Sequence, residues 1–305
     1  MVELAIASGK GGTGKTSLAG SFSALAEKAI LVDCDVDAAN LHLIVEHSVL
    51  EEHDFSSSRR ASIIEERCIL CGICEMQCRF EAIKRQIGLM GETFQIDPLA
   101  CEGCGLCKQI CPADAVAFES IISGQWFKSD SKTGPFFHAK LGIAEANSGK
   151  LVSLLRQQAR DEAQRREEAL IIIDSPPGIG CPVIASITGV TYLFIVTEPS
   201  LSAIHDMQRL VELARHFKIK TGLCINKFDI NPELTGQIEK FAEANDLKTH
   251  GRIPFDPKFT EAQLHGRPYT AIASGENLAT IEDIWRSVQI EFDAINTRKF
   301  NKKAV

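Results

Sequence analysis

A glycine-rich loop near the N-terminus restricts the possible folds of this chain more than any other feature. The stretch GKGGTGKTS, residues 9–17, fits the pattern G-x-x-x-x-G-K-[S/T] at Gly9, Gly14, Lys15 and Thr16. An apolar run, ELAIAS, precedes it and a helical pattern, KTSLAGSFSALAEKA, follows it. The sequence therefore predicts a phosphate-binding loop between a strand and a helix. A glycine turn with chance lysines is the alternative that these flanks disfavour.

The residue types of this loop suit the phosphates of a nucleotide. Glycines let backbone N–H groups converge on phosphate oxygens, and the start of the helix adds a favourable dipole. Lys15 would neutralise the β/γ-phosphate charge, and the Thr16 hydroxyl would ligate Mg²⁺. The candidate nucleotide-binding residues of the loop are Gly9, Lys10, Gly11, Gly12, Thr13, Gly14, Lys15, Thr16 and Ser17.

The sequence on either side of a cysteine-rich region alternates strand and helix patterns. ILVDCD, LIIID, TYLFIVTE, KTGLCIN and THGRIPF are predicted strands, and SAIHDMQRLVELARHF and ELTGQIEKFAEAN are predicted helices. SGQWFKSDSKTGPFFHAKLGI is a predicted hairpin with a glycine turn, and GKLVSLLRQQARDEAQRREEA a long helix with a solvated, charged face. This order predicts an α/β fold with a parallel sheet, and a ligand site at the carboxyl ends of its strands. Asp174, which follows LIII, suits the metal-side carboxylate of a nucleotide hydrolase.

Eight cysteines form two runs with the same spacing, C-x₂-C-x₂-C-x₃-C. The runs consist of Cys68, Cys71, Cys74 and Cys78, and of Cys101, Cys104, Cys107 and Cys111. This spacing is typical of [4Fe–4S] sites, in which three thiolates of one run bind a cluster and the fourth binds the other cluster. Zinc is the main alternative, but paired C-x-x-C knuckles need no third cysteine two residues further on. The predicted ligand sets are Cys68, Cys71, Cys74 and Cys111 for one cluster, and Cys101, Cys104, Cys107 and Cys78 for the other.

The two runs belong to an internal repeat, because matching tails, RFEAI and PADAV, follow them. We expect an inserted minidomain with pseudo-two-fold symmetry at residues 60–118, within an ATPase domain formed by residues 1–59 and 119–305. The minidomain resembles the bacterial two-cluster ferredoxins, an α+β fold, and Pro112 completes their usual run. It departs from them at Arg79, which follows Cys78 where a proline is usual, and which would alter the loop or the local potential without removing a ligand.

Three motifs make the larger part of the chain similar to one family. Lys10 in GKGGTGKT, the acidic stretch LVDCDVDAANLHL and the strand end DSPPGIG resemble the MinD-type ATPases, which include the nitrogenase iron protein. The resemblance covers the chain except for the cysteine region. It implies a P-loop ATPase that hydrolyses ATP with Mg²⁺ and forms a nucleotide-dependent dimer, either with itself or with a related ATPase.

The resemblance also implies roles for individual residues. Lys10 would reach the nucleotide phosphates of a partner subunit. Asp33 and Asp35 would hold the water shell of Mg²⁺ and position the attacking water, although a loop-capping carboxylate is the alternative for Asp33. The implied catalytic residues are Lys10, Lys15 and Asp35, and the implied Mg²⁺ residues are Thr16, Asp33 and Asp174.

The stretch CINKFD leaves the choice of base open. Asn226 resembles the base-contacting Asn of the MinD family, whereas N-K-x-D is also the guanine-reading pattern of GTPases. We favour ATP, without excluding GTP, because related ATPases keep Asn-Lys without guanine specificity. A turn capped by Asp229 is a further interpretation of that residue.

Composition and charge narrow the class of protein. The 305 residues carry a formal charge of −7, which argues against nucleic-acid binding, because phosphate backbones need a basic surface. MVELAIAS lacks the basic region of a signal peptide, and no apolar run approaches the roughly 20 residues that span a bilayer. We expect a cytoplasmic protein whose eleven cysteines are not disulfides. Outside the repeat, Cys34 and Cys224 are expected to be inert core thiols, as is Cys181, although a helix start there would lower its pKa.

These features together predict an ATPase whose nucleotide state gates docking or electron transfer by two [4Fe–4S] clusters, with an unidentified redox partner. Iron–sulfur assembly is an alternative, but scaffold relatives carry a C-x-x-C pair in the ATPase body, and this chain has none outside the repeat. Positioning at a membrane, as in the division-site member of the family, is a third. We expect no membrane binding, since the tail NTRKFNKKAV offers only Phe300 and Val305 as large apolar groups.

Overall fold

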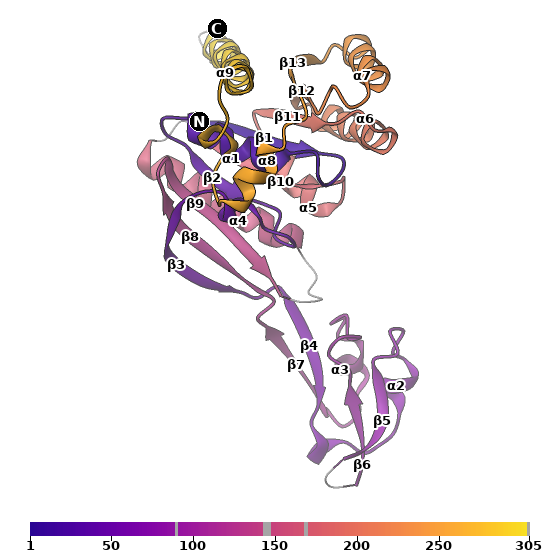
Figure 1. The fold of residues 1–305 in the computed structure, drawn as a ribbon. Helices are drawn as coiled ribbons and strands as arrows, with labels where there is room; N and C mark the ends of the chain where they lie inside the picture. The colour runs from indigo at the N-terminus through magenta and orange to yellow at the C-terminus, as the bar shows by residue number, and fades with distance from the viewer. Residues whose placement is uncertain (89–90, 143–147, 168–169, 304–305) are drawn as a thin grey trace. The chain divides into compact units, whose positions relative to one another are not determined.

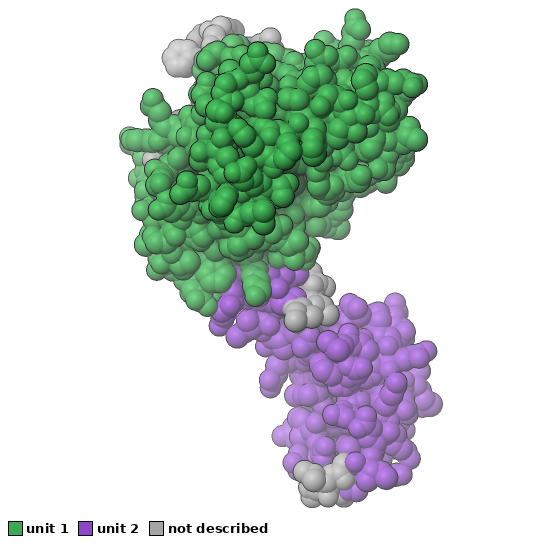
Figure 2. All heavy atoms as spheres, in the orientation of Figure 1, with its two compact units in different colours: residues 1–53, 126–140, 148–305 green, residues 54–125, 141–147 purple. Residues whose placement is uncertain are grey.

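The chain folds into two compact units. The computed structural model describes residues 1–88, 91–142, 148–167 and 170–303. Unit 1 comprises residues 1–53, 126–140 and 148–305, and unit 2 comprises residues 54–125 and 141–147 (Figure 2). Each unit has its own hydrophobic core, so each is described separately.

The centre of unit 1 is a nine-stranded sheet with the strand order β13-β12-β11-β1-β10-β2-β9-β8-β3 (Figure 1). Its strands are β1 (Val2–Ser8), β2 (Ile30–Asp33), β3 (His47–Phe55), β8 (Gly124–Ser131), β9 (Gly134–Leu141), β10 (Leu170–Pro177), β11 (Tyr192–Thr197), β12 (Lys220–Asn226) and β13 (Lys248–Ile253).

The predicted α/β architecture with a mostly parallel sheet is confirmed. The pairs from β13 through β9 are all parallel, and the six strands expected from apolar runs are β1, β2 and β10 to β13. Almost every residue of β1, β10 and β11 is buried, as expected for parallel strands covered on both faces. β8 and β9 form the predicted hairpin, so the sheet is not parallel throughout and continues to β3 at its edge.

Helices cover the sheet of unit 1. They are α1 (Lys15–Leu25), α4 (Ser148–Arg166), α5 (Cys181–Ile187), α6 (Leu201–His216), α7 (Pro232–Ala244), α8 (Lys258–Leu264) and α9 (Glu276–Lys303), with single 3₁₀ turns η1 (Leu41–Leu43) and η3 (Tyr269–Ala271). Within the described residues, none of the helices combines the length and the apolar character needed to cross a membrane.

The core packs α1 and α9 together against alternate residues of the central strands. Phe22 of α1 lies edge-on to Phe194 of β11, with ring centroids 5.3 Å apart, and its centroid is 5.0 Å from that of Trp285 on α9. Leu4 and Ile6 of β1 belong to the same buried cluster. Each fully buried side chain of this size contributes about 1.5–3 kcal/mol, so this layer holds the phosphate loop's helix firmly on the sheet.

A buried ion cluster connects α4 with β1 and with the end of α5. Glu3 of β1 accepts hydrogen bonds from Arg156 and Arg160 of α4, each at 2.6 Å. Arg156 also donates to the carbonyls of Ala185 and Thr188 at the end of α5 (2.7 and 2.9 Å). Burial alone would raise the pKa of Glu3, but the two guanidinium groups outweigh it and lower that pKa. The carboxylate is therefore charged and paired.

Unit 2 consists of two small antiparallel sheets with short helices between them. Its elements are β4 (Ser58–Ile63), η2 (Glu65–Arg67), α2 (Ile73–Met76), β5 (Ile83–Gly88), β6 (Gly91–Ile96), α3 (Leu106–Ile110) and β7 (Val116–Ile121). β4 pairs with β7 and β5 pairs with β6. The core is small and includes six of the eight repeat cysteines at its margin. Whether residues 60–118 are a ferredoxin-like domain stays a prediction.

The internal repeat is visible as two equivalent turns in unit 2. Gly72 and Gly105, at the same place in each cysteine run, both have φ of +75° and precede α2 and α3. An added Cβ would lie 3.8 Å from Phe94 at Gly72 and 3.3 Å from Phe118 at Gly105. Each run therefore bends over one aromatic ring.

Three histidines pack together in unit 1, near the hairpin of β8 and β9. The ring of His138 is stacked between Phe136 and Phe127, with centroids 4.7 and 5.0 Å away, and lies 5.3 Å from His47 and 5.7 Å from His42. Burial, with the neighbouring histidines adding to it, lowers the pKa of His138 to about 3. His138 is therefore neutral in the folded chain at ordinary pH.

This burial predicts a pH-dependent loss of stability. The ordinary His pKa is 6.5, so the unfolded chain binds a proton that the folded chain does not as the pH falls from 6.5 toward 3. His138 should then cost up to about 1.4 kcal/mol of unfolding free energy per pH unit. The variant His138→Phe should lose less stability over pH 6.5–4 in urea titrations, whereas His205→Asn, at an exposed histidine, should behave like the wild type. An equally steep acid loss in His138→Phe would contradict this.

Candidate functional site

The predicted phosphate loop lies between β1 and α1, at the carboxyl end of the sheet. Gly14 has φ of +92°, and a Cβ there would lie 2.4 Å from the side-chain amide nitrogen of Asn226. That nitrogen donates to the Thr13 carbonyl at 2.8 Å. Asn226, which the sequence predicted as a base contact, therefore braces the loop in addition to lining the pocket. Glycine is needed at position 14 because the loop and β12 approach so closely.

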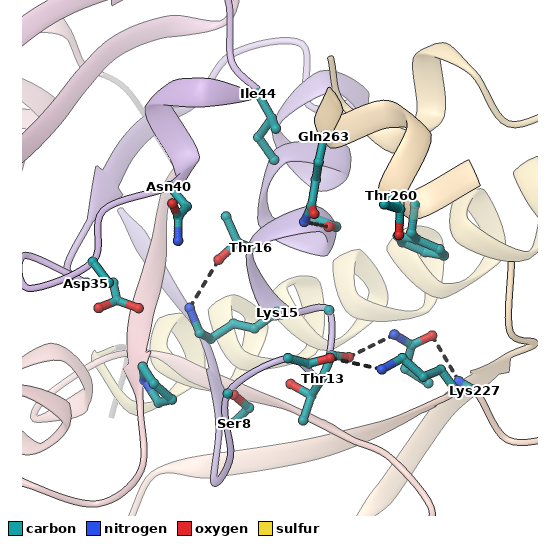
Figure 3. Close-up of a pocket in the computed structure, with 18 of the residues that line it drawn as sticks. Ser8, Thr13, Lys15, Thr16, Asp35, Asn40, Ile44, Lys227, Thr260 and Gln263 are labelled. Atoms are coloured by element: carbon teal, nitrogen blue, oxygen red, sulfur yellow. Dashed lines mark hydrogen bonds between the residues drawn. The ribbon is translucent and has the colours of Figure 1, made fainter. Parts of the chain in front are cut away.

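Lys15 is the buried cation of the site. Its side chain is 7% exposed, and its ammonium donates to Asp174 Oδ1 at 2.8 Å. The ammonium also donates to the Thr16 hydroxyl at 3.3 Å (Figure 3). Burial opposes the charge, but the carboxylates of Asp174, Asp33 and Asp35 outweigh it and raise the pKa of Lys15. The ammonium is thus charged and held beside the loop.

Asp33 and Asp174 lie on the neighbouring strands β2 and β10, paired in register. The backbone N–H groups of Asp35 and Leu41 donate to the two Asp33 oxygens, both at 3.0 Å. Burial, the nearby Asp174 and incomplete compensation by Lys15 raise the pKa of Asp33 to about 7. Among the described residues, Asp174 Oδ2 is buried and has no hydrogen-bond partner, so the Asp174 carboxylate fits an oxygen ligand or an outer-shell partner of Mg²⁺.

A pocket of about 610 Å³ opens above the loop, a volume usual for small-ligand sites. In Figure 3, Asp35 and Asn40 lie on one side of Lys15 and Thr16, and Thr260 and Gln263 lie on the other. Burial is the main reason why the pKa of Asp35 is raised. The lining residues of the loop are Gly11, Gly12, Thr13, Gly14, Lys15, Thr16 and Ser17.

Sequence reasoning missed several residues of the site. Glu198, at the end of β11, binds Lys10 at 3.3 Å and Lys227 at 2.8 Å, and Lys227 also donates to the Gly12 carbonyl at 3.0 Å. Gln263 donates to the Ser17 hydroxyl at 3.1 Å. Glu198 could have been found, because it is the polar residue that ends the buried run YLFIVTE.

Asp229, the last residue of N-K-x-D, accepts a hydrogen bond from the backbone N–H of Phe255 at 2.7 Å. This contact joins the loop after β12 to the loop after β13. It occupies one carboxylate oxygen with a structural role, as expected of a residue that caps a turn.

The eight repeat cysteines line two small cavities of unit 2, of about 20 and 30 Å³. Each cavity combines three cysteines of one run with the last cysteine of the other. The first is lined by Cys68, Cys71, Cys74 and Cys111, and the second by Cys101, Cys104, Cys107 and Cys78, with Cys74 shared. Four cysteines thus line the first cavity and five line the second, and each cavity includes the four cysteines of one predicted ligand set.

The thiols of these cavities are not arranged around a metal ion in this structure. Among the described residues, no three His, Cys, Asp or Glu side chains converge closely enough to hold one. Burial raises the pKa of Cys74 and of Cys107, and neighbouring thiols add to both shifts. The backbone N–H of Ala115 donates to Cys111 Sγ at 3.2 Å. The arrangement of the thiols among the described residues therefore does not support the predicted clusters.

The three remaining cysteines lie in unit 1. Cys34 and Cys224 are fully buried, and burial raises the pKa of both thiols, that of Cys224 to about 12. The predicted burial of Cys34 and Cys224 in the core is confirmed. The prediction that Cys181 lies in the core is wrong, because Cys181 is exposed at the first residue of α5, at the helix start that the sequence indicated.

Comparison with known proteins agrees with this geometry. A family model described as the CobQ/CobB/MinD/ParA nucleotide binding domain matches residues 4–269. An uncharacterised protein of Methanocaldococcus jannaschii is 37% identical over 236 residues, covering 76% of this chain and 80% of the relative. An uncharacterised ATP-binding protein of the same organism is 28% identical over 270 residues, covering 85% of this chain and 88% of the relative.

Solved structures show the same fold. The MinC:MinD cell division protein complex of Aquifex aeolicus matches with a TM-score of 0.56 and 17% identity, covering 95% of this chain and 96% of the other. The septum site-determining protein MinD of Pyrococcus horikoshii, solved with Mg-ADP, matches with a TM-score of 0.53 and 17% identity, covering 94% and 95%. The family model, the 37% identical relative and the loop geometry agree, and the chain therefore belongs to the CobQ/CobB/MinD/ParA nucleotide-binding family of P-loop ATPases.

Proposed function

We propose that this chain binds and hydrolyses Mg²⁺-ATP in the pocket of unit 1, and that nucleotide controls the pairing of two subunits. The observation that carries the proposal is the buried Lys15 ammonium beside a glycine loop, with Asp174 as its partner. A buried cation at this place is poised for phosphate oxygens. The similar MinD structure solved with Mg-ADP supports the same ligand here.

The residues around the pocket suit hydrolysis. Lys15 would bind β/γ-phosphate oxygens, and Thr16 would ligate Mg²⁺ with Asp33 and Asp174 in its surroundings. Asp35 lines the pocket, and its raised pKa makes the carboxylate a better acceptor for a proton of the attacking water. ATP is the proposed nucleotide, since Asp229 is engaged with the Phe255 N–H, and competition with GTP tests this choice.

The role of Lys15 in nucleotide binding can be tested by substitution. The variant Lys15→Ala should weaken Mg²⁺-ATP binding at least 100-fold, because it removes the charge nearest the β/γ oxygens; such charge-assisted contacts contribute about 1.5–3 kcal/mol each. Calorimetric titration with ATP, ADP and GTP measures the effect. The exposed Lys240→Ala on α7 is the control and should bind as the wild type does. Wild-type affinity in Lys15→Ala would contradict the assigned role.

For unit 2 we propose two [4Fe–4S] clusters. The support is the grouping of the thiols, because each cavity joins three cysteines of one run with the last cysteine of the other. The glycine turns over Phe94 and Phe118 repeat at both runs, as expected for two equivalent sites. When bound, such clusters supply one-electron transfer at potentials set by charge, hydrogen bonds and exposure. Cys71 and Cys104 are exposed, which would place an edge of each cluster near solvent.

The two functions are proposed to be coupled through the chain itself. Asp35 lines the nucleotide pocket, and the same segment continues through η1 and β3 into unit 2, which begins at Asp54. A change in the segment around the γ-phosphate would therefore be passed along the chain to β3, which leads into unit 2. Nucleotide state would then gate electron transfer, or docking of a redox partner, by the clusters.

A MinD-like positioning ATPase is the second candidate, and the comparisons favour it over an iron–sulfur role. Solved structures similar to this chain include cell-division MinD ATPases. The tail NTRKFNKKAV, for which no membrane binding is expected, has only Phe300 and Val305 as large apolar residues, and both lie outside the side chains that the structure describes. Sedimentation with anionic vesicles, with and without ATP, separates the two: ATP-dependent association would support positioning.

Iron–sulfur assembly is a third candidate with less support. A bridging thiol pair in the ATPase body would be expected, but Cys34 and Cys224 are buried in the core. Transfer of clusters to an apo-protein on addition of ATP would favour assembly, whereas retention of both clusters through turnover would favour electron transfer.

The proposed clusters can be tested by metal analysis and substitution. Protein purified without oxygen should contain about eight iron and eight acid-labile sulfide atoms per chain. The variant Cys78→Ser should perturb the cluster of the Cys101–Cys107 run rather than that of its own run, because Cys78 lines the other cavity. Paramagnetic resonance of the reduced protein resolves the two centres, and Cys181→Ser is the control. Two to four zinc ions with little iron would overturn the assignment.

The proposed coupling between the nucleotide state and the clusters can be tested by redox titration. Linkage of this kind is typically about 1–3 kcal/mol, which is about 40–130 mV for a one-electron couple. Potentials measured under ADP and under a non-hydrolysable ATP analogue should differ by an amount in this range, and reduction should change nucleotide affinity by the same free energy. Identical potentials and identical rates of electron transfer to an artificial acceptor would show that the clusters are not gated.

A further inference from the structure

Glu198 joins two lysines at the edge of the phosphate loop. Its Oε1 lies 3.3 Å from the Lys10 ammonium and its Oε2 lies 2.8 Å from the Lys227 ammonium. The side chain of Glu198 is 15% exposed, so the pair is shielded from bulk water more than an ordinary surface ion pair. Burial would raise the pKa of Glu198, but Lys227 and Lys10 outweigh it and lower that pKa. The carboxylate is therefore an anion that neutralises two cations at once.

The two lysines are held unequally. Lys227 also donates to the Gly12 carbonyl at 3.0 Å, and its side chain is 27% exposed, so it is fixed between the loop and Glu198. The Lys10 contact is longer, and the Lys10 side chain is 42% exposed. Lys10 is thus the cation that can leave Glu198 at the smaller cost in contacts and desolvation.

Among the described residues, the three lysines that lie at the loop, Lys10, Lys15 and Lys227, are each paired with a carboxylate. Asp174 neutralises Lys15, and Glu198 neutralises Lys10 and Lys227. In the proposed dimer, Lys15 would meet the phosphates of its own subunit's nucleotide and Lys10 those of the nucleotide of the partner subunit. These phosphates therefore compete with the carboxylates for the two cations. The Glu198 carboxylate thus provides the negative charge at Lys10 that a phosphate group would provide in the proposed dimer.

We propose that Glu198 is a positioning residue that holds the Lys10 ammonium within its own subunit until nucleotide phosphate takes it over. This inference rests on the proposed role of Lys10 at the phosphates of a nucleotide-bound dimer. Pairing of two subunits then includes an exchange: the Lys10–Glu198 contact breaks, Lys10 contacts phosphate, and Glu198 keeps Lys227. The strength of the Lys10–Glu198 contact sets how readily the dimer forms.

Two substitutions should act in opposite directions. Glu198→Gln keeps the shape but removes the charge, so Lys10 is released and the dimer should form at a concentration about tenfold lower. Lys227→Met leaves Glu198 with Lys10 alone, so Lys10 is held more tightly and the dimer should form at a higher concentration. A merely structural role of Glu198 in bracing the loop through Lys227 would move both variants in the same direction. Glu212→Gln, an exposed carboxylate on α6, is the charge-matched control.

The experiment measures the dimer dissociation constant by analytical ultracentrifugation with Mg²⁺ and a non-hydrolysable ATP analogue, in the full chain purified without oxygen. A second readout is the rate at which an N-hydroxysuccinimide ester acylates Lys10 without nucleotide, followed by peptide mass spectrometry. Release from Glu198 should raise this rate several-fold in Glu198→Gln and leave it unchanged in Glu212→Gln.

The outcomes separate the inference from the function on which it rests. A wild-type chain that stays monomeric with the analogue, while Glu198→Gln still raises the reactivity of Lys10, would overturn the dimer proposal and keep Glu198 as the partner of Lys10. An unchanged Lys10 reactivity in Glu198→Gln, or equal shifts of the dimer constant in Glu198→Gln and Lys227→Met, would overturn the inference itself.

Discussion

The buried pair between Lys15 and Asp174 is the interaction on which the rest of the site depends. A lone ammonium in this position would carry an uncompensated desolvation cost of several kcal/mol. The sheet supplies the compensation, because β10 places Asp174 next to the loop that follows β1, and β2 adds Asp33 in register with it. In this fold, the meeting of parallel strands at one edge of the sheet provides the carboxylates that compensate the buried Lys15 ammonium.

The same geometry explains why residues far apart in sequence meet. β1, β10, β2, β11 and β12 are neighbours in the parallel part of the sheet, and each contributes a polar residue at its carboxyl end. The contributions are the phosphate loop, Asp174, Asp33, Glu198 and Asn226. The close approach of β12 to the phosphate loop also restricts the sequence of the loop, because the Asn226 amide occupies the space that any Cβ at position 14 would need.

Much of this could be predicted from the sequence, and the exceptions have physical causes. Buried parallel strands and the loop have strong local patterns, so β1, β2 and β10 to β13 were expected. β3 was not, because HSVLEEHDF exposes Val49 and Leu50 next to each other and shows no two-residue period. The role of Glu198 was missed because a charge pair across the sheet leaves no signal in local spacing. α9 could have been found, since Ile281, Ile284, Trp285, Val288 and Phe292 recur at helical spacing.

At both proposed sites, the charge of the binding groups is already balanced. In unit 1 carboxylates balance lysine cations, and in unit 2 protons neutralise the thiols. In unit 1 the cations that phosphate needs are kept paired with carboxylates, so binding is an exchange of anions rather than the burial of new charge. In unit 2 burial raises the pKa of the Cys74 and Cys107 thiols, which favours their protonated form. Binding of the proposed clusters would therefore release protons and would become less favourable as the pH falls. At both proposed sites, ligand binding would thus displace a group that already balances the local charge, a carboxylate in unit 1 and a proton in unit 2.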